Sequence, residues 1–306
     1  MPNINMFSNK ANTMKKSQPR EDSLKTNQYD NNYPEIIISI KDRINRELNG
    51  FAINYEYHSA CKDFVAEVHN ILLSPEAKRV RGIIPVFIAN TLKMDIDECL
   101  LHGLAIELLH FTSLIHDDVI DEDNHRRGYP TLNKTFANNQ AVLIGDYMMC
   151  EVINYGLKSA HSFETIGLMV KAVQNLVAGL IMEQNVLPFE KSFSNYQEMA
   201  YLKTGSLFGL SFGLPFIGDK RFEAATFCGQ IFGLLFQIYD DYLDKNSDHG
   251  YENIFSILPK VEINKIWKEN YAKLLKDSRE IGIGTVVTGI EQYLRANGYF
   301  MDILKD

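Results

Sequence analysis

The chain has 306 residues, of which 45% are hydrophobic and 23% are charged, a composition typical of a globular protein and not of a disordered one. Its formal net charge of −8 argues against a nucleic-acid-binding protein, which usually presents a basic face. No uncharged apolar run reaches the roughly 18 residues of a membrane span, so no transmembrane segment is expected. The cysteines have no metal-binding spacing and are expected to be buried thiols in a reducing compartment: Cys61, Cys99, Cys150 and Cys228.

The first 33 residues are rich in Asn, Ser and Lys and poor in apolar side chains, so residues 1–33 are expected to form a disordered tail. The first 20 of them contain four basic residues and no acid, which leaves organellar targeting open. Arginine is scarce there and no amphipathic pattern is present, so a cytoplasmic location is favoured. Residues 34–306 are expected to form one domain, because neither a linker-like segment nor a solenoid repeat interrupts them.

Apolar residues recur with a helical period from about Tyr33 onward, and no strand is predicted. The pattern predicts helices over 34–48, 53–73, 136–158, 162–187 and 219–247, and further helices in 261–297 with a break at Gly282 and Gly284. The sequence therefore predicts an all-α fold, a single-domain helical bundle around a central cavity, because bundles build their sites from facing helices.

Three further helices are predicted from their start signals. Ser74-Pro75-Glu76 combines a capping hydroxyl, a proline and an acid, and predicts a helix that carries Lys78 and Arg81 on one face. Asp95 with Glu98 forms a capping box that opens a long helix. Ser194 with Gln197 forms a second box, which opens the helix that carries Lys203 and Thr204.

Two acidic motifs each end an apolar helical stretch, Asp117-Asp118-Val119-Ile120-Asp121 and Asp240-Asp241-Tyr242-Leu243-Asp244, and 123 positions (240 − 117) separate them. In a helix the first and last carboxylates of each motif project from one face and repel each other unless a cation lies between them. Such oxygen ligands suit Mg²⁺, which commonly bridges one or two carboxylates to a substrate phosphate. A solvated helix end is the alternative for one motif alone, and the second copy favours a paired metal site.

The chain resembles the trans-isoprenyl diphosphate synthases, the polyprenyl synthetase family, over roughly residues 35–300. Besides the aspartate motifs it shares, in the family's order, Lys78-Arg79-Val80-Arg81, His110, Arg126-Arg127-Gly128, Gly145-Asp146 and Lys203-Thr204-Gly205. The resemblance implies the isoprenoid synthase fold, a homodimer, and a prenyltransferase that joins isopentenyl diphosphate to an allylic diphosphate. It also implies Mg²⁺, with three ions bound together with the diphosphate.

The resemblance assigns roles to individual residues. Catalytic residues are Asp117, Asp118, Asp121, Asp240, Asp241 and Lys203. Metal ligands are Asp117, Asp121 and Asp240, with Asp244 as a water-mediated or outer ligand. Contacts to the allylic diphosphate are Arg126, Lys203, Thr204 and Gln237. The pocket for isopentenyl diphosphate comprises Lys78, Arg81, His110 and Arg127, and arginine's planar fork suits phosphate oxygens.

Product length in this family depends on the side chains just before the first motif. Thr112 and Ser113 are small, which predicts an open cavity and products of C20 or longer. Phe111, one residue further up, could close the cavity instead.

The chain departs from the family's pattern at three places. Glu76-Ala77 and Gly82 stand where the family has paired glycines and a proline, which a helix can absorb. Leu180 follows Gly179 where the family usually has glutamine, and Tyr251 stands where a loop lysine is expected, in a segment shortened after Asp244. Two alternative functions therefore remain, a weakly active or non-catalytic partner subunit and a terpene cyclase derived from the family. The retained isopentenyl diphosphate set speaks against a cyclase.

Overall fold

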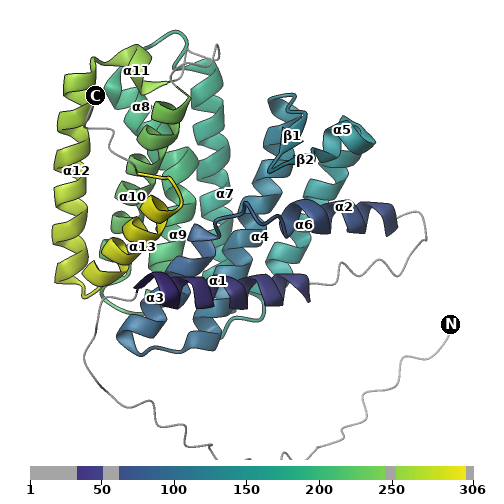
Figure 1. The fold of residues 1–306 in the computed structure, drawn as a ribbon, viewed down its shortest axis with the longest axis horizontal. Helices are drawn as coiled ribbons and strands as arrows, with labels where there is room; N and C mark the ends of the chain where they lie inside the picture. Colours follow the sequence, from purple (N-terminus) through teal and green to yellow (C-terminus); the bar gives the residue numbers. More distant parts are fainter. Residues whose placement is uncertain (1–32, 51–61, 245–252, 301–306) are drawn as a thin grey trace, which may run out of the picture. The chain divides into compact units, whose positions relative to one another are not determined.

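The computed structural model describes residues 33–50, 62–244 and 253–300. The chain forms a compact unit from Tyr33 onward (Figure 1). Of the tail predicted for residues 1–33, residues 1–32 lie outside the described residues, and a helix begins at Tyr33. The beginning of the helix predicted over 53–73 and the segment with Tyr251 also lie outside them.

The prediction of an all-α fold is confirmed. The helices are α1 (Tyr33–Asn49), α2 (Lys62–Leu72), α3 (Val80–Leu92), α4 (Ile96–Ile120), α5 (Leu132–Phe136), α6 (Asn138–Gly156), α7 (Ser162–Asn185), α8 (Phe193–Ala200), α9 (Ser206–Gly213), α10 (Phe222–Leu243), α11 (Ile254–Ile257), α12 (Lys260–Glu280) and α13 (Gly284–Ala296). A π-helical turn, η2 (Tyr201–Gly205), joins α8 to α9, and a 3₁₀ turn, η3 (Leu214–Phe216), follows α9.

One short hairpin was not predicted. Strands β1 (His125–Arg126) and β2 (Tyr129–Pro130) pair antiparallel just after the first aspartate motif. Arg127 (φ 53°) and Gly128 (φ 80°) form its two-residue turn, which requires positive φ at both positions. A pairing this short has no alternating apolar pattern, so periodicity could not reveal it.

The core is built around α9, all of whose residues are buried. This helix contacts α3, α4, α7 and α10, and thus links the two helices that end in the aspartate motifs. Aromatic contacts reinforce this centre: the ring centroids of Phe208 and Phe232 lie 5.0 Å apart and those of Phe208 and Phe236 5.2 Å apart. Such pairs stabilise a core beyond the area that they bury.

The start signal at Ser74-Pro75-Glu76 was misread. The Ser74 hydroxyl accepts a hydrogen bond from the Glu76 amide (3.3 Å) within a turn, and α3 begins only at Val80. Arg79 precedes it in a left-handed conformation (φ 57°), with its buried guanidinium donating to the Leu72 carbonyl and to Glu107 (3.4 Å). These tertiary contacts outweigh the local cap signal. Lys78 therefore lies in the connection before α3 and does not share a helix face with Arg81.

Of the two predicted capping residues, Asp95 is the observed cap and Ser194 is not. Asp95 caps α4 as predicted and accepts from the amides of Asp97 (2.9 Å) and Glu98 (3.1 Å). Glu98 does not complete the box, because its carboxylate accepts from Ser159 (2.5 Å) instead. The cap of α8 is Ser192, two residues before the predicted one, and its hydroxyl accepts from the amide of Asn195 (3.2 Å).

Among the described residues, α4 and α7 are long and apolar enough to cross a membrane by length and composition. No uncharged apolar run marks either helix in the sequence, because Glu107 interrupts the run in α4 and Lys171 interrupts the run in α7. The apolar window of α4 is 72% buried, as expected of a core helix, whereas that of α7 is only 22% buried. Part of α7 therefore presents apolar side chains at the surface.

Candidate active site

The three carboxylates of the first motif have different surroundings. Asp118 is buried and accepts an ion-paired hydrogen bond from Arg126 of β1, which also reaches Asp123 (3.0 Å). Burial, as the largest influence, raises the pKa of Asp117 to about 6, and the neighbouring charge of Asp121 acts in the same direction. Asp118 thus orients Arg126, while the charge of Lys203 acts on Asp117 and partly offsets the effect of burial on its pKa.

The second motif repeats this division. Asp241 accepts hydrogen bonds from Gln237 (2.9 Å) and from the amide of Ile254 (2.8 Å), which fixes the start of α11. Asp240 lines a cavity, where burial raises its pKa to about 7 although Arg81 and Lys78 act in the opposite direction. Burial is also the main reason that the pKa of Asp241 rises to about 6. Asp240, not Asp241, is the one that faces a possible ligand.

Thr204 and Gln237 were predicted to contact the allylic diphosphate. In the structure the Thr204 hydroxyl donates to the Gln237 side-chain carbonyl (2.6 Å), and the Gln237 amide in turn donates to Asp241. Both side chains therefore form a relay that links η2 to the second motif, and they hold Asp241 in place.

Lys203 lies in the π-helical turn and forms an ion pair with Glu183 of α7. The two segments approach closely because Gly179 has no side chain: a Cβ there would lie 2.4 Å from the Lys203 amide nitrogen. Burial lowers the pKa of Lys203, but the carboxylates of Glu183 and Asp117 outweigh it, so that the net shift is upward. Lys203 is thus firmly cationic beside the first motif.

Glu183 is a site residue that sequence reasoning did not assign. Its charge acts on Asp117 of the first motif and on Asp241 of the second, raising the pKa of each, so it is electrostatically linked to both motifs. The available signal was its spacing, four residues after Gly179, which places both on one face of α7.

A polar cavity of about 370 Å³ brings together most of the predicted substrate-binding cations. It is lined by Lys78, Arg81, His110, Arg126 and Arg127, and by Asp240 of the second motif. Because Asp118 of the first motif holds Arg126, both aspartate motifs contribute to the organisation of this cavity. Lys203 is not among its lining residues.

Arg81 is the most confined of these cations. Its guanidinium lies 4.4 Å from the Phe208 ring centroid, and its buried Nε has no hydrogen-bond partner among the described residues. Burial lowers its pKa to about 10. One terminal nitrogen lies 3.3 Å from His110 Nε2, and because guanidinium only donates, that imidazole nitrogen accepts and is unprotonated.

Lys78 and Arg127 complete the cationic wall. Lys78 Nζ lies 3.4 Å from the ring centroid of Tyr299, and burial lowers its pKa. Burial likewise lowers the pKa of Arg127. Glu107, which sequence reasoning did not identify, accepts from the amide of Gly82 (2.9 Å) and thereby ties the start of α3 to α4. Among the described residues, Arg126 has carboxylate partners in Asp118 and Asp123, whereas no ion pair within the described ranges involves Lys78, Arg81 or Arg127.

Within the described ranges, no three His, Cys, Asp or Glu side chains come together as a ready-made metal site. The donor set would nevertheless suit Mg²⁺, which prefers oxygen ligands, because Asp117 and Asp240 each offer a carboxylate that is desolvated by burial. Asp121 completes the exposed edge of the first motif, and Asp244 is exposed at the end of α10. A cation that arrives together with a phosphate ligand would fit this arrangement.

An apolar cavity of about 180 Å³ lies between α4, α6 and α7. Its lining includes Leu109, Met149, Val152 and Met169. Leu109 precedes Asp117 by two helical turns and thus lies on the same face of α4. Phe111, the residue that could have closed the cavity, is buried elsewhere and does not line it.

Thr112 and Ser113, on which the expectation of long products rested, both bond within α4. The Thr112 hydroxyl donates to the Leu108 carbonyl (2.8 Å), and the Ser113 hydroxyl donates to the His110 carbonyl (2.8 Å). Their polar groups are satisfied locally, so neither of them requires a partner in a cavity.

The profile of the polyprenyl synthetase family matches residues 62–252. A short chain isoprenyl diphosphate synthase of Methanocaldococcus jannaschii is 31% identical over 184 residues, which are 58% of this chain and 56% of that protein. An octaprenyl diphosphate synthase of Escherichia coli is 30% identical over 185 residues, with the same coverage of 58% and 56%. The alignments thus span about half the length of the curated relatives.

Solved structures show the same fold. A geranyltranstransferase from Thermotoga maritima superposes with a TM-score of 0.73 at 22% identity, covering 85% of this chain and 98% of that one. A geranyltransferase from Helicobacter pylori, solved in complex with magnesium and isoprenyl diphosphate, gives 0.70 at 19% identity, with coverage of 89% and 99%. The chain belongs to the polyprenyl synthetase family and has the isoprenoid synthase fold.

Proposed function

We propose that the protein is a prenyltransferase that condenses isopentenyl diphosphate with an allylic diphosphate. The observation that carries this proposal is the cavity in which Lys78, Arg81, His110 and Arg127 meet Asp240. Four groups that can contact a diphosphate lie there beside a carboxylate of the second motif. This arrangement suits a substrate that needs a cationic pocket of its own, next to a metal-dependent one.

The reaction begins with cleavage of the allylic C1–O bond, and the electron pair leaves with the diphosphate. The double bond of isopentenyl diphosphate then forms a new C–C bond to the allylic cation. The departed diphosphate accepts a proton from the carbon next to the new cationic centre, which restores a double bond. Arg126 and Lys203 are the cations placed beside the first motif to bind the departing diphosphate. The apolar side chains that line the cavity between α4, α6 and α7 would keep water from the allylic cation.

Asp117, Asp121 and Asp240 would hold Mg²⁺, with Asp244 as an outer ligand and three ions in all. The metal would supply positive charge to the diphosphate as it leaves. A fold relative that contains magnesium and isoprenyl diphosphate supports this part of the proposal. Asp118 and Asp241 contribute by orienting Arg126 and α11.

We further propose products of C20 or longer. Leu109 opens the apolar cavity two turns below Asp117, so a growing chain could pass along α4 into it. Relatives named octaprenyl and nonaprenyl diphosphate synthases, from Escherichia coli and Mycobacterium tuberculosis, support long products.

The homodimer expected from the resemblance is proposed to form through α6 and α7. Phe163, Val170 and Val177 recur every seven residues along α7, and their exposed fractions are 88%, 48% and 47%. Leu143 and Leu157, with exposed Cys150 midway between them, form a matching stripe on α6. Cys150 is therefore not the buried thiol that was predicted. Apolar stripes of this length are typical of interfaces between helices.

One assay tests the activity against its alternatives. The protein is incubated with Mg²⁺, labelled isopentenyl diphosphate and allylic diphosphates of increasing length. Labelled, longer diphosphates are the expected result. A hydrocarbon or alcohol without label would indicate a cyclase, and no turnover a partner subunit. Asp117→Ala should abolish turnover while Asp42→Ala, on the exposed side of α1, should not; an active Asp117→Ala variant would refute the metal assignment.

A further inference from the structure

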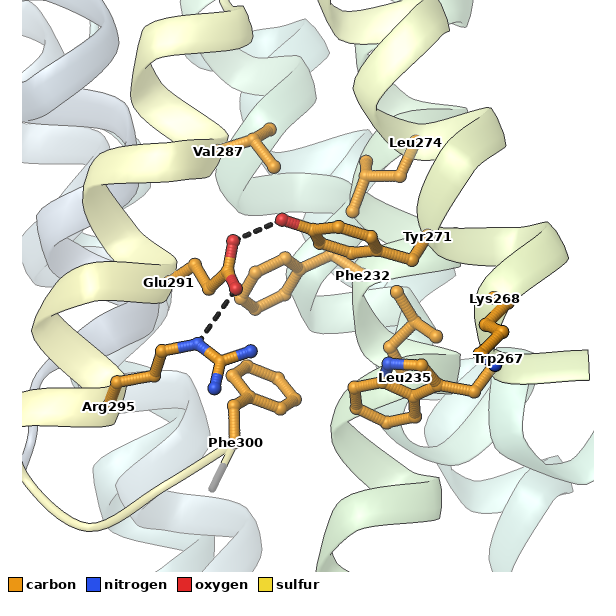
Figure 2. A pocket seen from close by; sticks show the side chains of 10 residues that line it. All are labelled: Phe232, Leu235, Trp267, Lys268, Tyr271, Leu274, Val287, Glu291, Arg295 and Phe300. Atoms are coloured by element: carbon orange, nitrogen blue, oxygen red, sulfur yellow. Dashed lines mark hydrogen bonds and ion pairs between the residues drawn. The ribbon is translucent and has the colours of Figure 1, made fainter. Parts of the chain in front are cut away.

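A separate cavity of about 160 Å³ lies between α10, α12 and α13 (Figure 2). Phe232, Leu235, Trp267, Leu274 and Phe300 form its apolar walls. Figure 2 shows these side chains surrounding the space, with charged groups from α12 and α13 beside them. None of the aspartate motifs or predicted substrate-binding residues lines it.

The size of the cavity limits its occupant. A dry apolar cavity of roughly 150 Å³ in another protein is known to hold benzene, so a body of one ring or a short branched chain matches this volume. The aromatic walls favour such a body, because ring–ring contacts contribute beyond the buried area.

The charges at the rim limit the occupant further. Glu291 accepts from the Tyr271 hydroxyl and from Arg295 (2.8 Å), so both of its oxygens have donors (Figure 2). Burial, with Glu291 as the next influence, raises the pKa of Tyr271, which keeps the phenol a donor. Lys268 adds a second cation to the lining. Two cations against one carboxylate leave a positive rim, which favours an anionic head group.

This apolar cavity shares a wall with the polar cavity of about 370 Å³ described above, here called the diphosphate cavity. Phe300 lines the apolar cavity, and its ring centroid lies 5.4 Å from that of Trp267. The preceding residue, Tyr299, lines the diphosphate cavity, where its ring contacts Lys78. Both rings contact Phe236, with centroid distances of 5.8 Å for Tyr299 and 6.0 Å for Phe300. A ligand that displaces Phe300 therefore acts on the support of Lys78.

We propose that this cavity is an effector site for a small monoanion with a single-ring or short branched apolar body, such as an aryl-alkyl carboxylate. Its occupancy changes the affinity of the diphosphate cavity through the Tyr299–Phe300 pair. The binding site stands independently of the proposed function, whereas the coupling rests on it.

Trp267 is the only tryptophan of the chain, so its fluorescence reports directly on the cavity. Titration with 3-phenylpropionate should give a saturable change, 3-phenylpropanol a weaker one, and 3-phenylpropylamine the weakest. Lys268→Glu should weaken binding of the carboxylate about tenfold and leave the alcohol unchanged, because only the anion senses the rim charge. Lys276→Glu, on the same helix but outside the cavity, should match the wild type.

Two outcomes would overturn the site. The first is that none of the three probes gives a saturable response. The second is that the carboxylate and the amine bind with equal affinity. Val287→Phe narrows the cavity and should abolish the response, and circular dichroism checks that this variant folds. Should it not fold, Lys268→Glu still decides, because an exposed charge reversal leaves the core intact.

Coupling is measured as the affinity for inorganic pyrophosphate with Mg²⁺, by calorimetry, with and without saturating 3-phenylpropionate. We expect a change of about fivefold or more, and by reciprocity pyrophosphate should shift the phenylpropionate titration by the same factor. Tyr299→Leu should remove this coupling while the fluorescence response persists. Unchanged pyrophosphate affinity would reject the coupling, and failure of pyrophosphate to bind at all would count against the proposed function, not against the site.

Discussion

Lys203 and Glu183 form an ion pair at the point where α7 approaches the π-helical turn, between the two aspartate motifs. The resemblance assigned Lys203 to the allylic diphosphate, but in the structure its ammonium group already has a carboxylate partner. Glu183 thus keeps Lys203 from pairing with Asp117 and Asp121, whose charges also act on it. The pair holds a cation beside the proposed metal ligands of the first motif.

Glu183→Gln should therefore raise the concentration of Mg²⁺ needed for activity by about tenfold, equivalent to about 1.4 kcal/mol. Glutamine keeps the shape but loses the charge, so Lys203 turns to Asp117 and competes with the metal. The measurement is a Mg²⁺ titration of turnover and of pyrophosphate binding. Glu190→Gln, an exposed change just beyond α7, serves as the control, and an unchanged titration in Glu183→Gln would contradict this role.

Arg81→Lys should raise KM for isopentenyl diphosphate about 10- to 100-fold and change kcat little, because lysine lacks the planar fork and the stacking on Phe208. Arg81 lines the polar cavity, where its planar fork can make a bidentate contact with a diphosphate. Steady-state kinetics with the allylic substrate saturating make the measurement. Arg46→Lys on the exposed side of α1 is the matched control. A selective fall in kcat would point instead to a role in the chemical step.

His110 should make the protein less stable in mild acid. Burial, followed by the charges of Arg81, Arg127 and Arg126, lowers its pKa well below the usual value. The unfolded chain binds a proton below about pH 6.5 while the folded one does not, so stability falls as the pH drops through that value. Between about pH 7.5 and about pH 5.5 this group should cost about 1 kcal/mol.

The test is urea denaturation of the wild type and of His110→Asn at both pH values. Asparagine can still accept from Arg81 but does not titrate, so the variant should lose about 1 kcal/mol less than the wild type. His125→Asn, at an exposed position in β1, should behave as the wild type does. Parallel stability losses in all three proteins would show that His110 is not responsible.

Sequence patterns predicted the fold class and most helices, because long apolar periodicity is a local signal. The aspartate motifs were found for a related reason, since two spaced repeats at helix ends need no knowledge of tertiary contacts. The start of α3 was missed because Arg79 is held in a left-handed conformation by Glu107 and the Leu72 carbonyl, which lie elsewhere in the chain. Local cap signals cannot reveal such contacts.

The roles within the site were predicted less well than its members. Asp118 and Asp241 belong to the motifs, yet each is turned toward donors in the protein, and Gln237 and Thr204 are engaged with each other. A spacing rule gives a side chain's helix face but not its hydrogen-bond partner. Tyr299 is a further example, because its ring lies against Lys78 although 221 positions (299 − 78) separate the two residues in the sequence.

Val177→Glu should dissociate the proposed dimer. The residue is the last member of the apolar stripe on α7, with 47% of its surface exposed in the single chain, and a carboxylate there would be buried without a partner at the interface. Sedimentation equilibrium or light scattering should show a monomer for this variant and a dimer for the wild type. Val261→Glu, on α12 with 81% exposure, is a matched change away from the stripe and should remain dimeric. A Val177→Glu variant that stays dimeric would exclude α7 from the interface, and a monomeric wild type would leave its apolar face to another kind of partner.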